Sequence, residues 1–359
     1  MNTEHELSLV FDLSDTYLLQ DYALTLFNPG TSITDYYLDQ NSRFRYDGST
    51  FTTCTKSGNK ASGTRLEYET KINASNDEDF KLFLKNSSKL IIEKERYNLD
   101  INPNYRMTAD VVKSPLKIGI IELEFDKREL LDKAIKKAEF LNLKICPLNA
   151  WKFNKRRIGI AGGPSSGKTS VAKELSLKLN NQYGANSSDV VEYATSFIQK
   201  MKRYPNFQDQ SWICMKQSER EDTISRTANI VLSDCPVFIS YIYAQRSMRG
   251  NTSTSFTDYA LQALYKRSIH SLDLYDKFYL LDTINYRENG VRYHNFEESK
   301  QVFSEIKQFL ENSGRCNKLN ICDYTKVDEI LKDILYLNDI RKLNEFINWC
   351  KYSLTYNGE

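Results

Sequence analysis

The chain has 359 residues, of which 27% are charged, and a net charge of +2 at neutral pH. Its length is typical of two domains, and its near-neutral charge gives no reason to expect nonspecific binding to nucleic acid. The chain has seven cysteines without a CxxC pair, an acidic start, and no apolar run of the roughly 20 residues that a membrane span needs. These features predict a soluble, cytoplasmic protein with reduced thiols.

Residues 1 to about 125 contain short stretches of alternating polarity, which predict β-strands with two different faces. Charged residues two positions apart share one face of such a strand. The basic members are Arg43, Arg45, Lys56, Arg65, Lys94 and Arg96, and the acidic members are Glu67, Glu69, Asp110, Glu122 and Glu124. These faces cannot be buried in an apolar core, so they either contact water or line a polar cavity. In a closed sheet with the charges inside, the cations would bind phosphates and the carboxylates a divalent metal.

Four of these segments, RFRYDGSTFTTCTKSG, RLEYET, KLIIEKERY and GIIELEFD, resemble the CYTH family of triphosphate tunnel enzymes, over about residues 4–150. The resemblance implies an antiparallel β-tunnel that cleaves triphosphates, or in some members cyclises ATP, with Mg²⁺ or Mn²⁺. It also implies that the six basic residues bind triphosphate and that Glu6 joins the other carboxylates at the metal.

The start of the chain departs from the ExExK motif with which that family begins. When the segment is aligned on Phe11, Ser8 replaces a metal-binding glutamate and Val10 replaces the lysine. A shift by two residues recovers Glu4 and Glu6 but not the lysine. The tunnel is therefore predicted to bind a triphosphate or nucleotide, and its hydrolysis is left as an open alternative.

An amphipathic helix is predicted over residues 127–141, because apolar residues recur there at spacings of three and four. Near residue 150 the pattern changes to that of an α/β domain, which predicts two domains, residues 1–152 and 153–359. A C-terminal helical segment is predicted to pack on the second domain through Leu335, Ile340, Leu343 and Phe346.

A phosphate-binding loop of the pattern GxxxxGK[ST] follows a predicted strand at 158–161 and opens a predicted helix. Its members are Gly162, Gly163, Pro164, Ser165, Ser166, Gly167, Lys168 and Thr169, with Ser170 next in the helix. Backbone N–H groups of such a loop and the helix N-terminus cradle phosphates. Lys168 would reach the β and γ phosphates of ATP, and the Thr169 hydroxyl would bind Mg²⁺.

Polar side chains also follow other predicted strands of the second half. Asp234 ends the stretch 229–234, where it could hold Mg²⁺ through water, orient a substrate hydroxyl, or only cap the strand. Glu192 ends another short strand and could act as a base. Arg287 and Arg292 follow the strand at 277–281, and they could close over the transferring phosphoryl group or remain solvated.

The segments GGPSSGKTS, VVEYATSF, VLSDCPVFISYIYA and KFYLLDTINYRENGVRYHNFEES, within about residues 156–312, resemble the nicotinamide riboside kinase-like group of P-loop kinases, often described as AAA-type ATPase domains. The resemblance implies a doubly wound parallel sheet and a kinase for a nucleoside, nucleotide or riboside. It places Glu192 and Asp234 near the acceptor. The group often has an arginine where this chain has Thr195, which leaves the acceptor's identity open.

The predicted architecture is therefore an antiparallel tunnel followed by an α/β P-loop domain. The first hypothesis is a bifunctional enzyme of nucleotide metabolism, with small-molecule nucleotides and triphosphates as its partners. The second is a nucleotide-sensing or sequestering protein whose P-loop domain is a switch. Action on nucleic-acid 5′ ends is a third hypothesis, which the near-neutral charge does not favour. The sequence predicts no oligomeric state.

Overall fold

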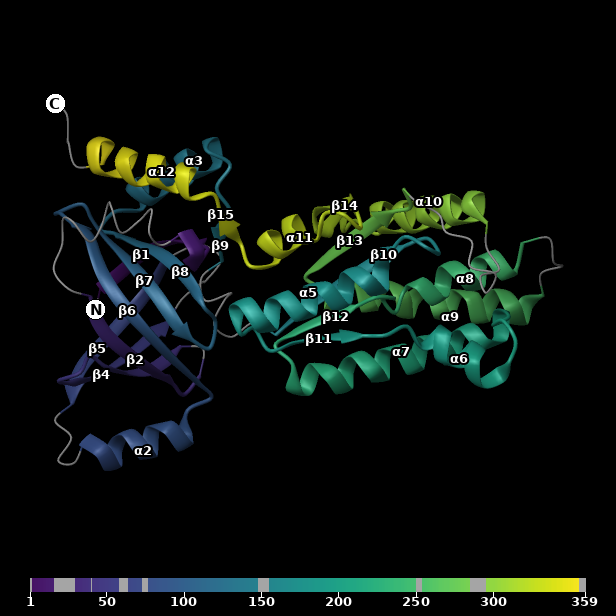
Figure 1. Cartoon of the computed structure of the whole chain (residues 1–359), viewed down its shortest axis with the longest axis horizontal. Helices are drawn as coiled ribbons and strands as arrows, with labels where there is room; N and C mark the ends of the chain where they lie inside the picture. The colour runs from purple at the N-terminus through teal and green to yellow at the C-terminus, as the bar shows by residue number, and fades with distance from the viewer. Residues whose placement is uncertain are drawn as a thin grey trace. The chain divides into compact units, whose positions relative to one another are not determined.

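The computed structural model describes residues 2–15, 30–39, 41–57, 64–72, 77–147, 155–249, 254–284 and 295–354. The chain divides into two compact units (Figure 1). The first unit comprises residues 1–154, 182–184 and 332–359, and the second comprises 155–181 and 185–331. Within the described ranges, no helix is both long enough and apolar enough to cross a membrane.

The first unit is built on one mainly antiparallel sheet that closes into a tunnel, because β1 pairs with β5 on one side and with β8 on the other. Around the tunnel the strands follow the order β1-β5-β4-β3-β2-β6-β7-β8. The strands are β1 (Asn2–Phe11), β2 (Thr31–Tyr37), β3 (Ser42–Tyr46), β4 (Phe51–Ser57), β5 (Thr64–Ile72), β6 (Leu90–Ile101), β7 (Tyr105–Ser114), β8 (Ile118–Phe125), β9 (Ile145–Cys146) and β15 (Leu337–Asn338). The antiparallel tunnel predicted for the first half is confirmed.

The alternation of side chains in β1 separates an apolar outer face from a polar inner face. Leu7, Leu9 and Phe11 belong to the main apolar core of the unit, whereas Glu6 and Ser8 occupy the opposite face. The charged residues predicted to share strand faces also point inward: Lys56, Lys94, Arg96, Asp110 and Glu122 are buried, whereas the others that the structure describes are partly or largely exposed. Most of them line a polar cavity inside the tunnel.

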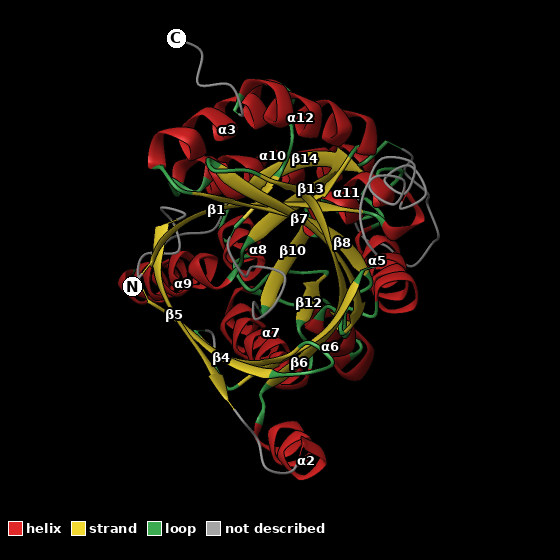
Figure 2. Ribbon diagram, turned by 90° about the vertical axis from the view of Figure 1, so that its left-hand side faces the viewer, coloured by secondary structure: helices red, strands yellow, loops and turns green. Residues whose placement is uncertain are grey.

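Two helices, α3 (Arg128–Phe140) and α12 (Ile340–Ser353), lie side by side on the outer face of the tunnel (Figures 1 and 2). Leu343 and Phe346 of α12 have no exposed surface and share one apolar core with residues of β1, β7 and β8. A third helix, α2 (Asp77–Ser87), covers another part of the sheet, where Leu84 packs with Phe51.

The predicted packing of the C-terminal segment on the second domain is therefore wrong. That segment belongs to the first unit, and β15 extends its sheet by pairing in parallel with β1. Asn338 fixes this strand, because its Nδ2 donates to the carbonyl oxygens of Val10 and Lys144, both at 3.0 Å. The periodicity of the sequence showed an apolar helix face, but periodicity does not identify the surface that covers such a face.

The second unit contains a parallel sheet of order β11-β12-β10-β13-β14. Its strands are β10 (Arg156–Gly162), β11 (Ser187–Val190), β12 (Ile230–Ser233), β13 (Lys277–Asp282) and β14 (Leu319–Asp323). Its helices are α5 (Lys168–Tyr183), α6 (Tyr193–Met201), α7 (Phe207–Thr227), α8 (Ile239–Ser247), α9 (Ser255–Ser271), α10 (Phe296–Asn312) and α11 (Val327–Ile334). Figure 2 shows α5 on one side of the sheet and α8 on the other. This doubly wound arrangement confirms the predicted α/β class.

Local sequence explains where several of these elements begin. Helices α7, α9 and α10 each start with a capping box, in which the side chains of the N-cap and N3 residues bind each other's backbone N–H groups. Strand β10 is almost wholly buried, as expected for a parallel strand that helices cover on both faces. The carboxyl ends of β10, β12 and β13 therefore meet at one edge, which is where ligands bind in sheets of this type.

Candidate functional sites

The phosphate-binding loop predicted at residues 162–169 lies between the end of β10 at Gly162 and the start of α5 at Lys168. Gly167 has φ +87°, a left-handed conformation that favours glycine. Gly163 is required for a different reason, since a Cβ there would lie 2.2 Å from the carbonyl oxygen of Ser299 in α10. Ser299 also donates from its hydroxyl to the carbonyl of Pro164 at 2.6 Å. The loop is thus held between its own helix and the start of α10.

The side chains of Lys168 and Thr169 both form hydrogen bonds in the structure. Lys168 folds over the loop, with Nζ donating to the carbonyl oxygens of Gly162 at 3.1 Å and Gly163 at 2.8 Å. The Thr169 hydroxyl donates to Oδ2 of Asp234 at 2.6 Å. The hydroxyl of the loop and the carboxylate at the end of β12 therefore meet, as sequence reasoning placed them.

Asp234 is buried, and one of its two carboxylate oxygens accepts no hydrogen bond from a described residue. Its residue is 2% exposed, and its Oδ1 has no hydrogen-bond partner among the described residues. Burial raises the pKa of Asp234; the hydrogen bond from Thr169 opposes this rise, and the nearby charge of Glu192 adds to it. An orphaned buried oxygen is uncommon in folded proteins, and it leaves Asp234 with an acceptor atom that no described residue uses.

Glu192 lies close enough to affect the carboxyl of Asp234 and the thiol of Cys235 electrostatically. It occupies the N-cap position of α6, two residues beyond the end of β11, rather than the end of the strand itself. Its Oε2 accepts from the hydroxyl of Thr195 at 3.2 Å. The structure thus brings Lys168, Thr169, Asp234 and Glu192 to one edge of the sheet.

The other residues predicted for this site are two serines of the loop region and two arginines that follow β13. Ser166 is buried with an orphaned hydroxyl, whereas Ser170 is exposed in the first turn of α5. Arg287 and Arg292 lie outside the described residues. Sequence reasoning missed Tyr324, which packs against the loop. A Cβ added at Gly167 would lie only 2.8 Å from the Cβ of Tyr324. Tyr324 directly follows β14, and the rule that ligands bind at the carboxyl ends of parallel strands was the available signal.

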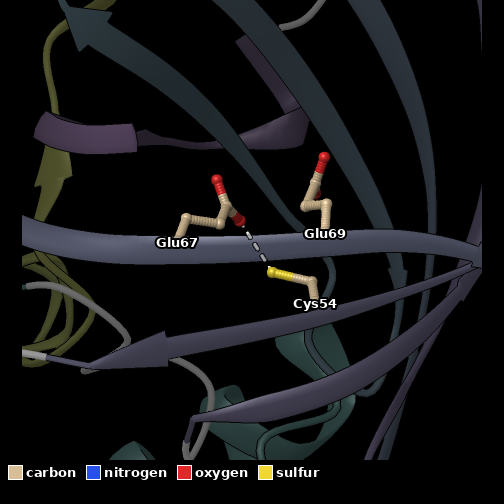
Figure 3. A group of neighbouring side chains, drawn as sticks. All are labelled: Cys54, Glu67 and Glu69. Carbon is tan, nitrogen blue, oxygen red and sulfur yellow. Dashed lines mark hydrogen bonds between the residues drawn. The ribbon is translucent and has the colours of Figure 1, made fainter. Parts of the chain in front are cut away.

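A cavity of about 110 Å³ lies within the tunnel of the first unit. Polar and charged side chains line it, namely Glu6, Tyr37, Asn41, Arg43, Arg45, Cys54, Lys56, Glu67, Glu69, Arg96, Arg106, Glu122 and Glu124. Most of the residues predicted to bind triphosphate or metal therefore converge on one cavity. Sequence reasoning missed Arg106 and Cys54, because neither belongs to a pair of like charges two positions apart. Figure 3 shows the Cys54 thiol and its hydrogen bond to Oε1 of Glu67, at 2.7 Å.

Charges of the two signs lie on different walls of the cavity. The lining glutamates come from β5, β1 and β8, which are consecutive in the sheet, whereas the lining cations come from β3, β4, β6 and β7. Where the walls meet, Arg106 is opposite Glu124 in register. Lys56 contacts both Glu6 and Glu67, with Nζ–Oε1 distances of 3.6 and 3.3 Å. Such a cavity offers cations for phosphate oxygens and carboxylates for metal ions.

Lys94 and Asp110 do not line the cavity, although sequence reasoning predicted them as ligands. Both are buried in an ion-pair network next to the cavity, where Lys94 and Arg96 contact Asp110. Arg96 also donates to Oε2 of Glu122 at 2.5 Å. Burial alone would raise the pKa of Asp110, but the charges of Arg96 and Lys94 lower it. The side chain of Arg65 lies outside the described residues.

Asp35 in β2 is a further buried carboxylate in this network, and sequence reasoning missed it because no charged residue lies two positions away from it on the same strand. It is 1% exposed and accepts from Nε and Nη2 of Arg45 at 2.8 and 3.0 Å. Arg43 and Lys94 approach it to 3.7 Å. Burial would raise the pKa of Asp35, but the charges of Arg45, Arg43 and Lys94 hold it well below its usual range. Asp35 therefore fixes the side chains of the basic wall.

We expect Asp35→Asn to lower the free energy of unfolding of the first unit by about 3–5 kcal/mol at neutral pH, because Arg43 and Arg45 lose their counter-charge and the buried Lys94 loses one of its two. The folded-state pKa of Asp35 lies below the unfolded value, so its stabilisation is complete above about pH 4 and is lost as the pH falls further. Wild type should therefore lose stability between about pH 4 and pH 2 more steeply than the variant. Equal pH slopes in urea unfolding, with the exposed Asp126→Asn variant as control, would contradict this role.

Residues 157–325 match a family model described as an AAA domain, which confirms the resemblance predicted for the second half. No curated protein gives a significant match to the chain. Among solved structures, a NadR protein in complex with NR is 15% identical with a TM-score of 0.41, and the match covers 56% of this chain and 57% of that one. The chain thus spans less than two thirds of that protein's length.

Two further solved structures are similar to parts of the chain. A conserved hypothetical protein from Pyrococcus furiosus is 20% identical with a TM-score of 0.31, and the match covers 40% of this chain and 95% of that one. The inorganic triphosphatase NE1496 is 20% identical with a TM-score of 0.23, and the match covers 37% of this chain and 80% of that one. Likenesses this distant assign no activity.

Proposed function

We propose that the second unit is an ATP-dependent kinase that transfers a phosphoryl group to a hydroxyl of a nucleoside, nucleotide or riboside. The observation that carries the proposal is the buried Oδ1 of Asp234, which has no hydrogen-bond partner and lies beside the phosphate-binding loop. A loop that only shapes the fold does not need an orphaned carboxylate oxygen next to it, since leaving such an atom unpaired costs about 1–3 kcal/mol.

Each residue of the site has a distinct part in this reaction. The N–H groups of the loop hold the phosphates of ATP, and Lys168 neutralises charge on the transferred group. The Thr169 hydroxyl and the Asp234 carboxylate are hard oxygen donors that fit Mg²⁺, which supplies further charge neutralisation when bound. Glu192 is the proposed acceptor of the hydroxyl proton, since it lies near Asp234 but outside the loop.

We include Arg287 and Arg292 in the proposed site on the basis of the sequence only. Cations on a segment that follows a strand of the sheet would stabilise charge on the phosphoryl group in the transition state. The choice between nucleoside, nucleotide and riboside depends on the acceptor pocket, for which Thr195 and Glu192 are the residues to vary first.

An acceptor screen tests the kinase proposal. The full chain is incubated with Mg²⁺ and ATP labelled on its γ phosphate, with nucleosides, ribosides and mononucleotides offered in turn, and labelled product is separated from free phosphate. We expect one acceptor class to receive the label. If every acceptor leaves the rate of ATP consumption unchanged and receives no label, the second unit is an NTPase switch instead.

For the first unit we propose binding of a triphosphate together with a divalent metal, which the opposed basic and acidic walls favour. Arg106 is the sharpest probe of this proposal, because it lines the cavity but is exposed and takes no part in the buried ion-pair network. A ligand present at 100 times its Kd stabilises the native state by about 2.7 kcal/mol. Hydrolysis is the further possibility, and sequestration without cleavage is the competing one.

We expect inorganic triphosphate with Mn²⁺ to raise the melting temperature of the full chain, and Arg106→Glu to remove most of that shift, measured from the melting temperature of the free variant. Lys133→Glu, an exposed change of the same charge on α3, is the control and should keep the shift. Phosphate release in the same samples separates cleavage from binding. The binding proposal fails if no triphosphate, with or without metal, changes the melting temperature.

A further inference from the structure

The carboxylate of Glu221, in α7, is the centre of a buried hydrogen-bond network in the second unit. Glu221 has no exposed surface. Its Oε1 accepts from the hydroxyl of Ser233 at 2.6 Å, and its Oε2 accepts from the hydroxyl of Tyr275 at 2.6 Å and from Nη1 of Arg157 at 3.2 Å. One turn earlier in α7, Nε2 of Gln217 donates to Oε1 of Glu221 and to Oγ of Ser233, both at 3.4 Å. These residues lie outside the candidate site, but they contact the backbone on which it is built.

The network holds both ends of the turn that carries Asp234. Ser233, which donates to Glu221, directly precedes Asp234. The hydroxyl of Tyr275 accepts from the backbone N–H of Val237, three residues beyond Asp234, at 3.0 Å. Ser233 and Tyr275 are themselves buried. Glu221 therefore fixes this turn directly at its start and through Tyr275 at its end.

Gln217 extends the network to the segment that carries Glu192. Glu192 occupies the N-cap position of α6, but its side chain makes no capping hydrogen bond. The first N–H groups of a helix have no partner within that helix. Here the N–H of Tyr193, the first residue of α6, donates to Oε1 of Gln217 at 2.8 Å. A glutamine of another helix thus satisfies a backbone donor at this helix start, and the Glu192 carboxylate is not needed for it.

We propose that Gln217 is a positioning residue for phosphoryl transfer, because it joins the backbone beside Glu192 to the network that holds Asp234 and so fixes the separation of the two carboxylates. This inference rests on the proposed kinase function of the site. In that reaction Glu192 accepts the proton of the acceptor hydroxyl, and Asp234 holds the metal at the phosphates. The separation of the two groups therefore determines how the hydroxyl meets the phosphoryl group, and a misplacement of about 1 Å can cost about 100-fold in rate.

A purely structural role would require less than this network provides. Arg157 already gives Glu221 a counter-charge at 3.2 Å, and Arg220 already holds the segment before α6, with Nη1 donating to the carbonyl of Val191 at 3.2 Å. Neither of these contacts links the two segments that carry the carboxylates. The amide of Gln217 does, because its oxygen accepts from the start of α6 and its nitrogen donates toward the end of β12. An apolar side chain of the same length would fill the space without making that link.

Gln217→Met tests the proposal, because methionine is similar in length but offers only a weak sulfur acceptor and no N–H donor. The rate is measured on the full chain with the acceptor class found in the screen. We expect kcat to fall about 10–100-fold while KM for ATP stays within about threefold, since the loop that holds the phosphates is unchanged. Gln210→Met is the matched control, because Gln210 is another buried glutamine of α7 that the network does not include. It should keep kcat within about threefold of wild type.

Ser233→Ala removes the other end of the link, and it decides the question if Gln217→Met does not fold. We expect it to lower kcat in the same way. The double variant should lose less than the product of the two single losses, because residues of one hydrogen-bond network do not act independently. Losses that multiply overturn the coupling, and so does a wild-type kcat in Gln217→Met.

Amide hydrogen exchange distinguishes a failure of this inference from a failure of the kinase proposal. In Gln217→Met, peptides that cover residues 191–197 and 233–238 should both exchange faster than in wild type and in Gln210→Met. Faster exchange in the first peptide alone means that Gln217 only caps α6, which overturns the coupling. If the wild-type chain labels no acceptor, the kinase proposal fails, and the exchange of the two peptides still decides whether Gln217 joins their segments.

Discussion

Lys168→Ala is expected to lower phosphoryl transfer by the second unit by about 10²–10³-fold, the loss typical of removing one charged or hydrogen-bonding group that stabilises a transition state. In the structure, Nζ of Lys168 lies over the loop and donates to two of its carbonyl oxygens, at 2.8 and 3.1 Å. In the proposed function, Lys168 exchanges these hydrogen bonds for the phosphates of ATP. Transfer of label from ATP to the acceptor class found in the screen measures the effect.

Lys173→Ala is the control for this prediction, because Lys173 is an exposed lysine on the same helix, α5. It should leave transfer within about twofold of wild type, as substitutions away from a site usually do. The response of the melting temperature to triphosphate should survive in both variants, since the cavity belongs to the other unit. If the Lys168→Ala chain transfers label at the wild-type rate, the residues of the loop do not form the ATP site.

The second large effect concerns stability. Phe346→Ala is expected to lower the free energy of unfolding of the first unit by about 3–5 kcal/mol, which is the usual cost of removing a buried phenyl ring. Phe346 has no exposed surface and lies in the apolar core that α12 shares with α3 and the tunnel strands. Tyr352→Ala on the same helix is the control, because 73% of that residue is exposed.

The measurement must separate the two units, since two units need not unfold in one transition. Amide hydrogen exchange of peptides from β1, β7 and β8 reports on the first unit, and exchange of peptides from β10 and β13 reports on the second. We expect Phe346→Ala to accelerate exchange in the first group only. Faster exchange in the β10 and β13 peptides with no change in β1 would instead support the packing that was predicted from the sequence.

The phosphate-binding loop could be predicted from the sequence because its chemistry is local. The conformation of the loop depends on eight consecutive residues, the strand before them and the helix that they open. Asp234 and Glu192 were predicted nearly as well, because parallel strands bring their carboxyl ends to one edge. For Glu192 the error was small: β11 ends at Val190, and Glu192 occupies the N-cap position of the following helix without a capping hydrogen bond from its side chain.

For the tunnel, the sequence predicted which charged residues share a strand face but not which of them form ion pairs. Alternation predicts which residues share a face, so the convergence of Arg43, Arg45 and the glutamates followed once the sheet closed. Alternation does not predict which charges neutralise each other across strands. Arg96 is the register partner of Asp110 and Lys94 contacts the same carboxylate, so Lys94 and Asp110 are buried in an ion-pair network instead of lining the cavity. Asp35, which has no charged neighbour two positions away on its strand, likewise has its partner Arg45 across the β2–β3 register.

The division of the first unit along the chain has a consequence for how the protein is made. Its sheet begins with β1, but β15 and α12, which complete its edge and its apolar core, follow the second unit in the chain. Residues 185–331 of the second unit leave the ribosome before those elements do. Domains generally fold as they emerge, so the unit that is synthesised first is expected to reach its native state last. During that interval the apolar outer face around β1, β7 and β8 lacks the cover that α12 gives it, so apolar surface of the first unit is exposed at that stage.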